Sequence, residues 1–198
     1  MLVDSHSHLD AAEFDADRGE VIARARQAGV TRQVLCATAA AQWPKLREVC
    51  VEEGLYPAYG LHPTFLALHR RQHLEQLRGW LEREHPVAVG ECGLDYFVEG
   101  LDRQAQMEYF EAQLRLAREY ELPVIVHARR AVDAVIAAIS AGSAWRKPAT
   151  TSSTFTSRAG SLRWPRMSAS GWSGESVSSS SHSSGMLAAR RRRRCARS

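Results

Sequence analysis

The chain has 198 residues, 44% of them hydrophobic, which is long enough for one medium-sized domain with a buried core. No apolar run approaches the length of a membrane span, and no basic region with a following apolar stretch opens the chain, so we expect neither a membrane protein nor a secretion signal. The four cysteines form no Cys-x-x-Cys pair, which predicts a cytoplasmic protein with reduced thiols.

The formal net charge of +4 is distributed unevenly along the chain. Residues 140–198 contain 11 basic residues and one acid, whereas the residues before them contain 15 basic and 21 acidic residues. The two parts therefore carry formal charges of +10 and −6, and nearly all of the serines lie in the second part. We expect a folded domain at 1–139 and a Ser/Arg-rich tail at 140–198 that is disordered or translated out of frame.

The first 139 residues alternate strand-like segments with segments of helical periodicity. Apolar residues at helical spacing predict an inward face for helix 72–84 (Leu74, Leu77 and Leu81) and for helix 103–121 (Met107, Phe110, Leu114 and Ala117). Gly29 and Gly54 follow the first two helical segments and are expected to end them. Apolar strands that alternate with helices are typical of a parallel sheet covered by helices. In chain order we expect strand 2–4, helix 18–28, strand 33–37, helix 42–53, strand 55–60, helix 72–84, strand 87–91, helix 103–121, strand 123–127 and helix 131–139.

The first strand leads into the sequence Asp-Ser-His-Ser-His-Leu-Asp at 4–10. His6 and His8 are two positions apart, so an extended backbone directs both imidazoles to the same side. Imidazoles are ligands of divalent transition metals, and Asp4 and Asp10 could orient them from nearby. We therefore predict a metal site here, and the alternative is a polar turn that binds no metal.

Three later polar residues come at or just after the ends of expected strands, namely His62, Glu91 and His127. In a βα-barrel the carboxyl ends of the strands meet at one edge, where active sites are built. We therefore expect these side chains to converge on His6 and His8.

Four sequence motifs lie within about residues 1–139. They are Val-Asp-Ser-His-Ser-His-Leu-Asp at 3–10, Tyr-Gly-Leu-His-Pro at 59–63, Val-Gly-Glu-Cys-Gly-Leu-Asp-Tyr at 89–96 and Leu-Pro-Val-Ile-Val-His-Ala-Arg at 122–129. In their order and spacing they resemble the TatD family of metal-dependent hydrolases, which are amidohydrolase-like TIM barrels. The resemblance implies an α/β fold, an incomplete TIM (β/α) barrel with about five of eight βα units.

The resemblance also implies a ligand set for two divalent ions, which could be Zn, Mn, Mg or Co. His6 and His8 would hold one ion, His127 the other, and Glu91 would bridge them. The substrate would be DNA, cleaved as by a deoxyribonuclease or related phosphodiesterase. The family has a further histidine and a further aspartate later in the chain, and neither is found here, since His182 is the only histidine after 127 and lies in a serine run.

Three other residues of these motifs have open roles. Asp95 could orient a water or a ligand histidine, or cap a loop. His62 could contact a substrate phosphate or stiffen the loop before Pro63, and Arg129 could bind a phosphate or pair with an acid. We assign Glu91 and Asp95 as catalytic and His62 and Arg129 as substrate-binding, and we expect Cys92 to be a small buried residue.

The change of composition near residue 140 suggests a hypothesis about the gene. Arginine outnumbers lysine 24 to 2, which indicates GC-rich coding DNA, and out-of-frame reading of such DNA yields the residues that dominate the tail. Three functions remain open: a DNA hydrolase impaired in this chain, a hydrolase of another ester or amide such as aminoacyl-tRNA, and an inactive truncated product. The oligomeric state is also open.

Overall fold

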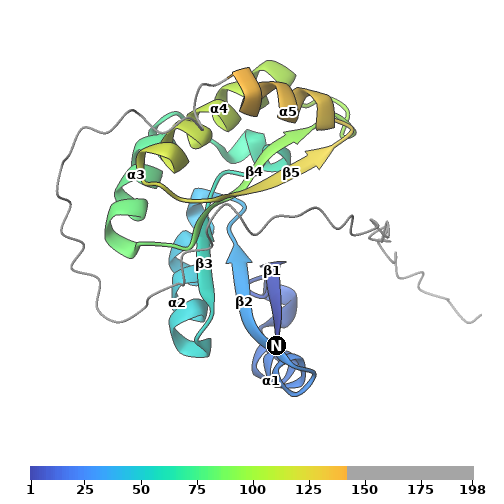
Figure 1. The fold of residues 1–198 in the computed structure, drawn as a ribbon, viewed down its shortest axis with the longest axis vertical. Coiled ribbons are helices and arrows are strands. Elements are labelled where there is room, and N and C mark those ends of the chain that lie inside the picture. The colour runs from blue at the N-terminus through green and yellow to red at the C-terminus, as the bar shows by residue number, and fades with distance from the viewer. Residues whose placement is uncertain (142–198) are drawn as a thin grey trace, which may run out of the picture. The chain divides into compact units, whose positions relative to one another are not determined.

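Each strand of the sheet pairs in parallel with the next strand along the chain. The computed structural model describes residues 1–141, and in this part the strand order is β1-β2-β3-β4-β5 (Figure 1). The strands are β1 (Leu2–Ser7), β2 (Val30–Cys36), β3 (Tyr56–Tyr59), β4 (Ala88–Asp95) and β5 (Val124–Arg129).

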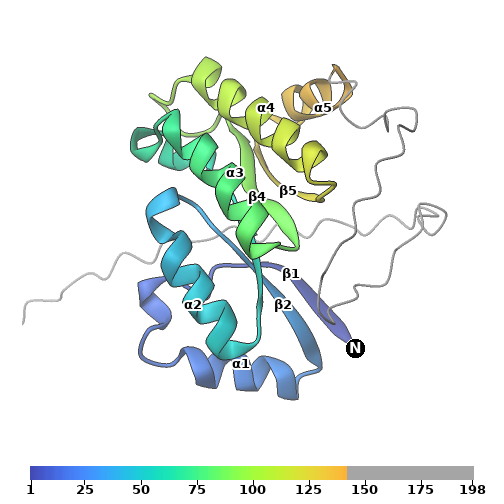
Figure 2. The same cartoon turned by 90° about the vertical axis from the view of Figure 1, so that its left-hand side faces the viewer.

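A helix follows each strand, as the alternating pattern predicted. Figure 2 shows α2, α3 and α4 in front of the strands. Short 3-10 helices, which the sequence analysis did not predict, precede some of them. The helices are α1 (Arg18–Gln27), α2 (Trp43–Glu53), α3 (Gln72–Glu84), α4 (Arg103–Glu119) and α5 (Val132–Ala141), and the 3-10 helices are η1 (Ala12–Phe14), η2 (Ala40–Gln42) and η3 (Pro63–Leu68).

Four strands are longer than expected, and in β1, β4 and β5 the difference corrects the placement of the site residues. His6, Glu91 and His127 lie within β1, β4 and β5, not at or after their ends. The reason is that β4 and β5 continue to pair beyond Glu91, from Cys92 opposite Val126 onward. Because the polar side chains face one side of the sheet, they do not interrupt the backbone ladder.

Two clusters of buried apolar residues hold the helices against the strands. Trp43, Leu77 and Leu81 belong to the larger cluster, which joins α2 and α3 to the sheet. Phe110 and Leu114, from the predicted apolar face of α4, pack in a second cluster with β4 and α5. The periodicity of α3 and α4 therefore predicted their buried faces correctly, whereas Ile22 is the only residue of α1 that is buried.

A close approach between β4 and β5 depends on Gly93. This residue has φ +144°, and a Cβ at this position would lie 2.1 Å from the carbonyl oxygen of His127. A side chain therefore cannot be accommodated there without separating the two strands. Gly93 is opposite His127 in the strand register, so the glycine fixes how closely His127 approaches β4.

Two buried glutamines on α4 hold the backbone at two points near the site. The amide of Gln113 accepts from the N–H of Leu61 at 2.7 Å and donates to its carbonyl at 3.1 Å. The amide of Gln106 makes the same pair of bonds with Asp95, at 2.7 and 2.9 Å. One helix thereby positions the residue that precedes His62 and the residue that ends β4.

α5 continues to Ala141, two residues into the tail expected at 140–198, and the domain boundary expected near residue 140 stays a prediction. The tail at 140–198 lies outside the described residues apart from its first two, so the frame-change hypothesis stays a prediction. No helix among the described residues has the length and apolar character needed to cross a membrane.

Candidate metal centre

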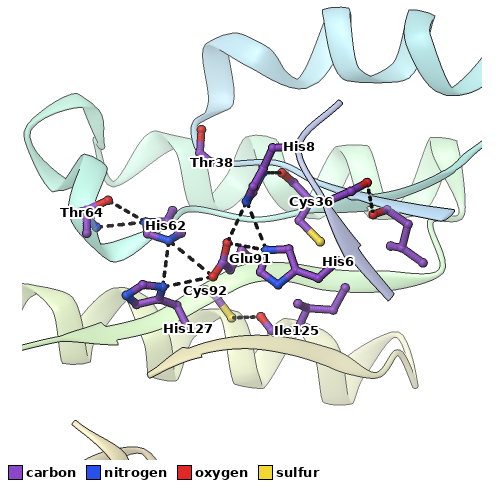
Figure 3. A network of polar contacts seen from close by, with 12 residues as sticks. His6, His8, Cys36, Thr38, His62, Thr64, Glu91, Cys92, Ile125 and His127 are labelled. Carbon is purple, nitrogen blue, oxygen red and sulfur yellow. Dashed lines mark hydrogen bonds and ion pairs between the residues drawn. The ribbon is translucent and has the colours of Figure 1, made fainter. Parts of the chain in front are cut away.

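The carboxylate of Glu91 lies between two groups of histidines, and the side chain is only 4% exposed (Figure 3). Its Oε2 atom is 2.9 Å from Nε2 of His6 and 3.4 Å from Nε2 of His8. Its Oε1 atom is 3.1 Å from Nδ1 of His127 and 3.5 Å from Nε2 of His62. Each carboxylate oxygen therefore faces one pair of imidazoles, and the expected convergence of these residues is observed.

The donor atoms are spaced closely enough to hold metal ions. In the group His6, His8 and Glu91, and in the group His62, Glu91 and His127, all donor atoms lie within 4.8 Å of one another. Imidazole nitrogens with a carboxylate oxygen are a donor set that suits Zn, Mn or Co. Among the described residues, no lysine or arginine forms an ion pair with Glu91. Each group therefore has donor atoms that could hold a divalent ion, and Glu91 belongs to both groups.

The histidines keep the buried carboxylate ionised. Burial by itself would raise the pKa of Glu91, but hydrogen bonds from His127, His6, His62 and His8 lower this pKa far below its ordinary range. In return, the hydrogen bond to Glu91 raises the pKa of His8. Burial would lower the pKa of His127, but its bonds to Glu91 and Asp95 raise it. Without a metal, positive charge is thus drawn to this carboxylate from the surrounding rings.

Hydrogen bonds on the far side of two rings determine which nitrogen is free to bind a metal. Nδ1 of His8 lies 2.9 Å from the carbonyl oxygen of Cys36, which can only accept, so the proton of the neutral ring is on Nδ1. Nε2 of His127 lies 2.9 Å from Oδ2 of Asp95 and donates to it. The remaining nitrogen of each neutral ring therefore directs a lone pair toward Glu91.

His62 has the opposite arrangement. The backbone N–H of Thr64 donates to Nδ1 of His62 at 3.2 Å, so this nitrogen must accept. The proton of the neutral ring is then on Nε2, which is 3.1 Å from Nδ1 of His127. His62 consequently presents an N–H donor to the centre, whereas His8 and His127 present lone pairs. This agrees better with the predicted contact to substrate than with a metal ligand.

Asp95 uses both of its carboxylate oxygens. Oδ2 accepts from His127, while Oδ1 accepts from the N–H groups of Phe97 at 2.9 Å and Val98 at 3.0 Å. Burial would raise the pKa of Asp95, but the Val98, His127 and Phe97 hydrogen bonds lower it. Asp95 therefore both orients a histidine and caps a loop. These two roles were alternatives when judged from the sequence.

The other residues expected near the site behave differently from one another. Oδ1 of Asp4 accepts from the backbone N–H of His6, and Asp10 is buried with no hydrogen bond to an imidazole among the described residues. A carboxylate was expected to orient the first histidine pair, but the group that orients His8 is the carbonyl oxygen of Cys36. Cys92 is fully buried, as predicted, and burial raises the pKa of its thiol.

Gln106 and Gln113 position the site although they were not predicted from the sequence to do so. They are seven positions apart and share the buried face of α4 with Phe110 and Leu114. Two amides at helical spacing on an otherwise apolar face are the signal that could have identified them.

The parallel strand order and the donor set toward the carboxyl ends of the strands define this part of the chain as five successive βα units of a metal-dependent hydrolase barrel. The sequence profile described as TatD related DNase matches residues 3–161. The chain therefore belongs to the TatD family, as its motifs predicted.

Several relatives share this region of sequence. The uncharacterized metal-dependent hydrolase YjjV of Escherichia coli (strain K12) is 40% identical over 135 residues, which are 67% of this chain and 52% of the relative. The 3'-5' ssDNA/RNA exonuclease TatD of Pantoea sp. (strain At-9b) is 37% identical over 138 residues, again 67% and 52% of the two chains. The chain thus spans about half the length of the curated relatives it matches.

Solved structures agree with this assignment. The crystal structure of YjjV from Escherichia coli K12 superposes with a TM-score of 0.68 at 38% identity, covering 71% of this chain and 55% of that one. A TatD family hydrolase from Entamoeba histolytica, at 22% identity and a TM-score of 0.62, shares the fold over 68% of this chain and 52% of its own.

Proposed function

We propose that the protein is a divalent-metal-dependent hydrolase of phosphodiester bonds in DNA. The observation that carries this proposal is the Glu91 carboxylate, which has a pair of imidazoles at each oxygen. A carboxylate so placed can contact two cations at once. The relatives named as single-stranded DNA and RNA exonucleases support nucleic acid as the substrate class.

In this proposal His6, His8, Glu91 and His127 hold two divalent ions of Zn, Mn, Mg or Co. Bound ions would supply a water of lowered pKa and positive charge for the phosphoryl oxygens. His6 lies in β1 and His8 follows directly after it, while Glu91 and His127 come from the neighbouring strands β4 and β5, so the sheet sets the spacing of the ligands.

The chain's own residues prepare the site for an anionic substrate. Asp95 and the Cys36 carbonyl hold the rings of His127 and His8 with their lone pairs inward. His62 directs its Nε2–H to the same centre, where it can donate to a substrate oxygen. Its backbone is fixed as well, since the N–H of His62 donates to the Thr38 carbonyl at 2.9 Å.

The described residues supply only part of the family's site, because the later histidine and aspartate of the family have no counterpart in them. We therefore propose that hydrolysis by the chain of 198 residues is weak. The cytoplasmic location and the disordered or out-of-frame tail stay predictions.

Metal binding and hydrolysis can be tested separately with the full chain. Glu91→Gln removes the shared charge, and Glu48→Gln on the exposed side of α2 is the matched control. We expect the parent and the control to bind Zn²⁺ or Mn²⁺ in a titration and to degrade end-labelled single-stranded DNA slowly, whereas Glu91→Gln loses at least tenfold in metal affinity and all measurable hydrolysis.

The substrate class is decided by a parallel assay. An aminoacyl-tRNA or an amide substrate cleaved faster than DNA would replace the proposed substrate while keeping the metal centre. Equal metal affinity of Glu91→Gln and the parent would refute the shared-carboxylate site. Metal binding without hydrolysis of any substrate would identify the chain as an inactive product.

A further inference from the structure

Arginine side chains stack on aromatic rings in the loop that follows β4, beside the candidate metal centre. The guanidinium carbon of Arg129 lies 3.7 Å from the centroid of the Phe97 ring, and that of Arg130 lies 4.6 Å from the same centroid. The guanidinium of Arg103 lies over Tyr96 at 4.5 Å.

The positive charges of the two arginines that lie over Phe97 are not neutralised within the described part of the chain. Neither Arg129 nor Arg130 forms an ion pair with a carboxylate of residues 1–141, whereas Arg18, Arg47 and others do. Both arginines are exposed, and Phe97 is 41% exposed. An aromatic face holds a guanidinium in place without cancelling its charge. The surface therefore carries two charged groups of fixed position in a domain that is otherwise acidic.

Strand geometry places Arg129 on the side of the sheet that faces the site. His127 is opposite Gly93 and Arg129 is opposite Asp95 in the register of β4 and β5. Since side chains two positions apart share a face, Arg129 lies about 7 Å beyond His127 along β5. The N–H of Tyr96 donates to the Arg129 carbonyl at 2.9 Å, which joins the loop to the end of β5.

Asp95 fixes both the loop that contains Phe97 and the ring of His127, a candidate metal ligand. Asp95 accepts from the N–H of Phe97 through one oxygen and from His127 through the other. Arg130 has φ +52°, a left-handed conformation that is unfavourable for a non-glycine residue. Such conformations are concentrated at ligand sites, where the surrounding structure maintains them.

We propose that Arg129 and Arg130, held by Phe97, form a clamp for two phosphates of single-stranded nucleic acid at the β5 side of the metal centre. The inference rests on the proposed function and specifies how the substrate strand is held. Guanidinium groups match phosphate oxygens with two parallel hydrogen bonds. The exposed part of the Phe97 ring can contact an unstacked base, which a duplex would not offer.

The test measures binding without hydrolysis. The full chain, with the five arginines at 190–194 replaced by glutamine because such a run binds nucleic acid by itself, is titrated against a fluorescent single-stranded oligodeoxynucleotide in EDTA. Affinity is measured by anisotropy over a range of salt concentrations. The double variant Arg129→Gln/Arg130→Gln is compared with Arg24→Gln, an exposed arginine on α1.

We expect the double variant to bind about tenfold more weakly and its salt dependence, as log K against log salt, to be shallower by about 1.4, since each phosphate contact on a single strand contributes about 0.7. Arg24→Gln should change the affinity less than twofold. An unchanged affinity or slope in the double variant, or an equal loss in the control, would overturn the clamp.

Two further variants test the guanidinium groups and the aromatic ring separately, and both keep the two positive charges. Arg129→Lys/Arg130→Lys should retain the salt slope but lose several-fold in affinity, because lysine neither stacks in a plane nor binds phosphate bidentately. Phe97→Leu should give a loss of similar size. Full affinity in both variants would also overturn the clamp. The binding assay in EDTA is independent of hydrolysis. If the clamp binds the oligonucleotide as expected but the chain with metal hydrolyses no DNA, the proposed function alone is refuted.

Discussion

Asp95 and His127 are joined by a hydrogen bond of 2.9 Å between Oδ2 and Nε2. Nδ1 of the same imidazole lies 3.1 Å from Glu91. By accepting a hydrogen bond from one ring nitrogen, Asp95 leaves the other free for a cation at Glu91. The contact makes Asp95 a positioning residue for a proposed ligand, and it links the chemistry of the centre to the loop that begins at Tyr96.

Replacement of Asp95 by asparagine should weaken metal binding. Asp95 accepts three hydrogen bonds on two oxygens, whereas asparagine has one acceptor oxygen and would turn its NH₂ group toward His127 or toward the loop N–H groups. We expect metal affinity to fall about 10- to 100-fold.

Competition titration with a chromophoric chelator measures this change. Asp102→Asn, at the amino end of α4, keeps an acceptor for the N–H groups of Gln104 and Ala105 and should leave the affinity unchanged. Parent-like binding by Asp95→Asn would show that the orientation of His127 does not depend on the carboxylate.

The stability of the metal-free chain should pass through a maximum in mildly acidic solution. The pKa of Glu91 is lowered on folding, so its contribution is present above the ordinary value of 4.5 and is lost as the pH falls further. The pKa values of His8 and His127 are raised, so their contribution is present below 6.5 and is lost as the pH rises through the folded values.

Thermal unfolding in EDTA should therefore give the highest midpoint between roughly pH 4.5 and 6.5. In Glu91→Gln the profile should be flatter on both sides, because one charge is responsible for much of each shift. A midpoint that rises steadily to pH 8 in the parent would contradict this interpretation.

Gly93→Ala should disrupt the pairing of β4 with β5. The added Cβ would lie 2.1 Å from the His127 carbonyl oxygen, a backbone atom that cannot rotate away, and φ +144° is unfavourable for alanine. We expect a loss of at least about 3 kcal/mol in the free energy of unfolding, measured by urea denaturation.

Gly79→Ala in α3 is the matched control. Its Cβ would lie 3.1 Å from Nη1 of Arg83, the mobile end of a long side chain, so the substitution should be neutral or stabilising by up to about 1 kcal/mol. Equal effects of the two alanines would mean that the approach of the strands at Gly93 is not limiting.

Gln113→Met should destabilise the chain although methionine is the more apolar residue. The substitution leaves the N–H and carbonyl of Leu61 without the partners that Gln113 supplies, at a cost of about 1–3 kcal/mol. Gln104→Met, on the exposed side of the same helix, should change the unfolding free energy by less than about 0.5 kcal/mol. A stabilised Gln113→Met variant would show that the buried amide is dispensable.

Most of the fold could be predicted from the sequence, because apolar strands and periodic helices each leave a local pattern. The ten regular elements were placed correctly, and the apolar spacing of α3 and α4 identified their buried faces. The ends of the strands could not be predicted, since the ladder beyond Glu91 depends on pairing between residues such as Leu94 and Ala128 that are distant in sequence.

The members of the candidate centre could be predicted, but their individual arrangements could not. His6, His8, Glu91 and His127 do converge. The proton positions depend on partners such as Thr64 and the Cys36 carbonyl, which no motif indicates. The buried amides of α4 were missed because a helical pattern records only which residues are apolar.

The donors around Glu91 come from both ends of the described chain, and this has a consequence for biosynthesis. A ribosome delivers His6 and His8 first, and β4 follows only after about 80 further residues. Until β5 has also emerged, Glu91 lacks His127, and the nascent sheet presents an acidic group beside an open strand edge. A metal captured early by the first histidine pair would therefore be held by an unfinished centre, and cellular chaperones would encounter the chain in that state.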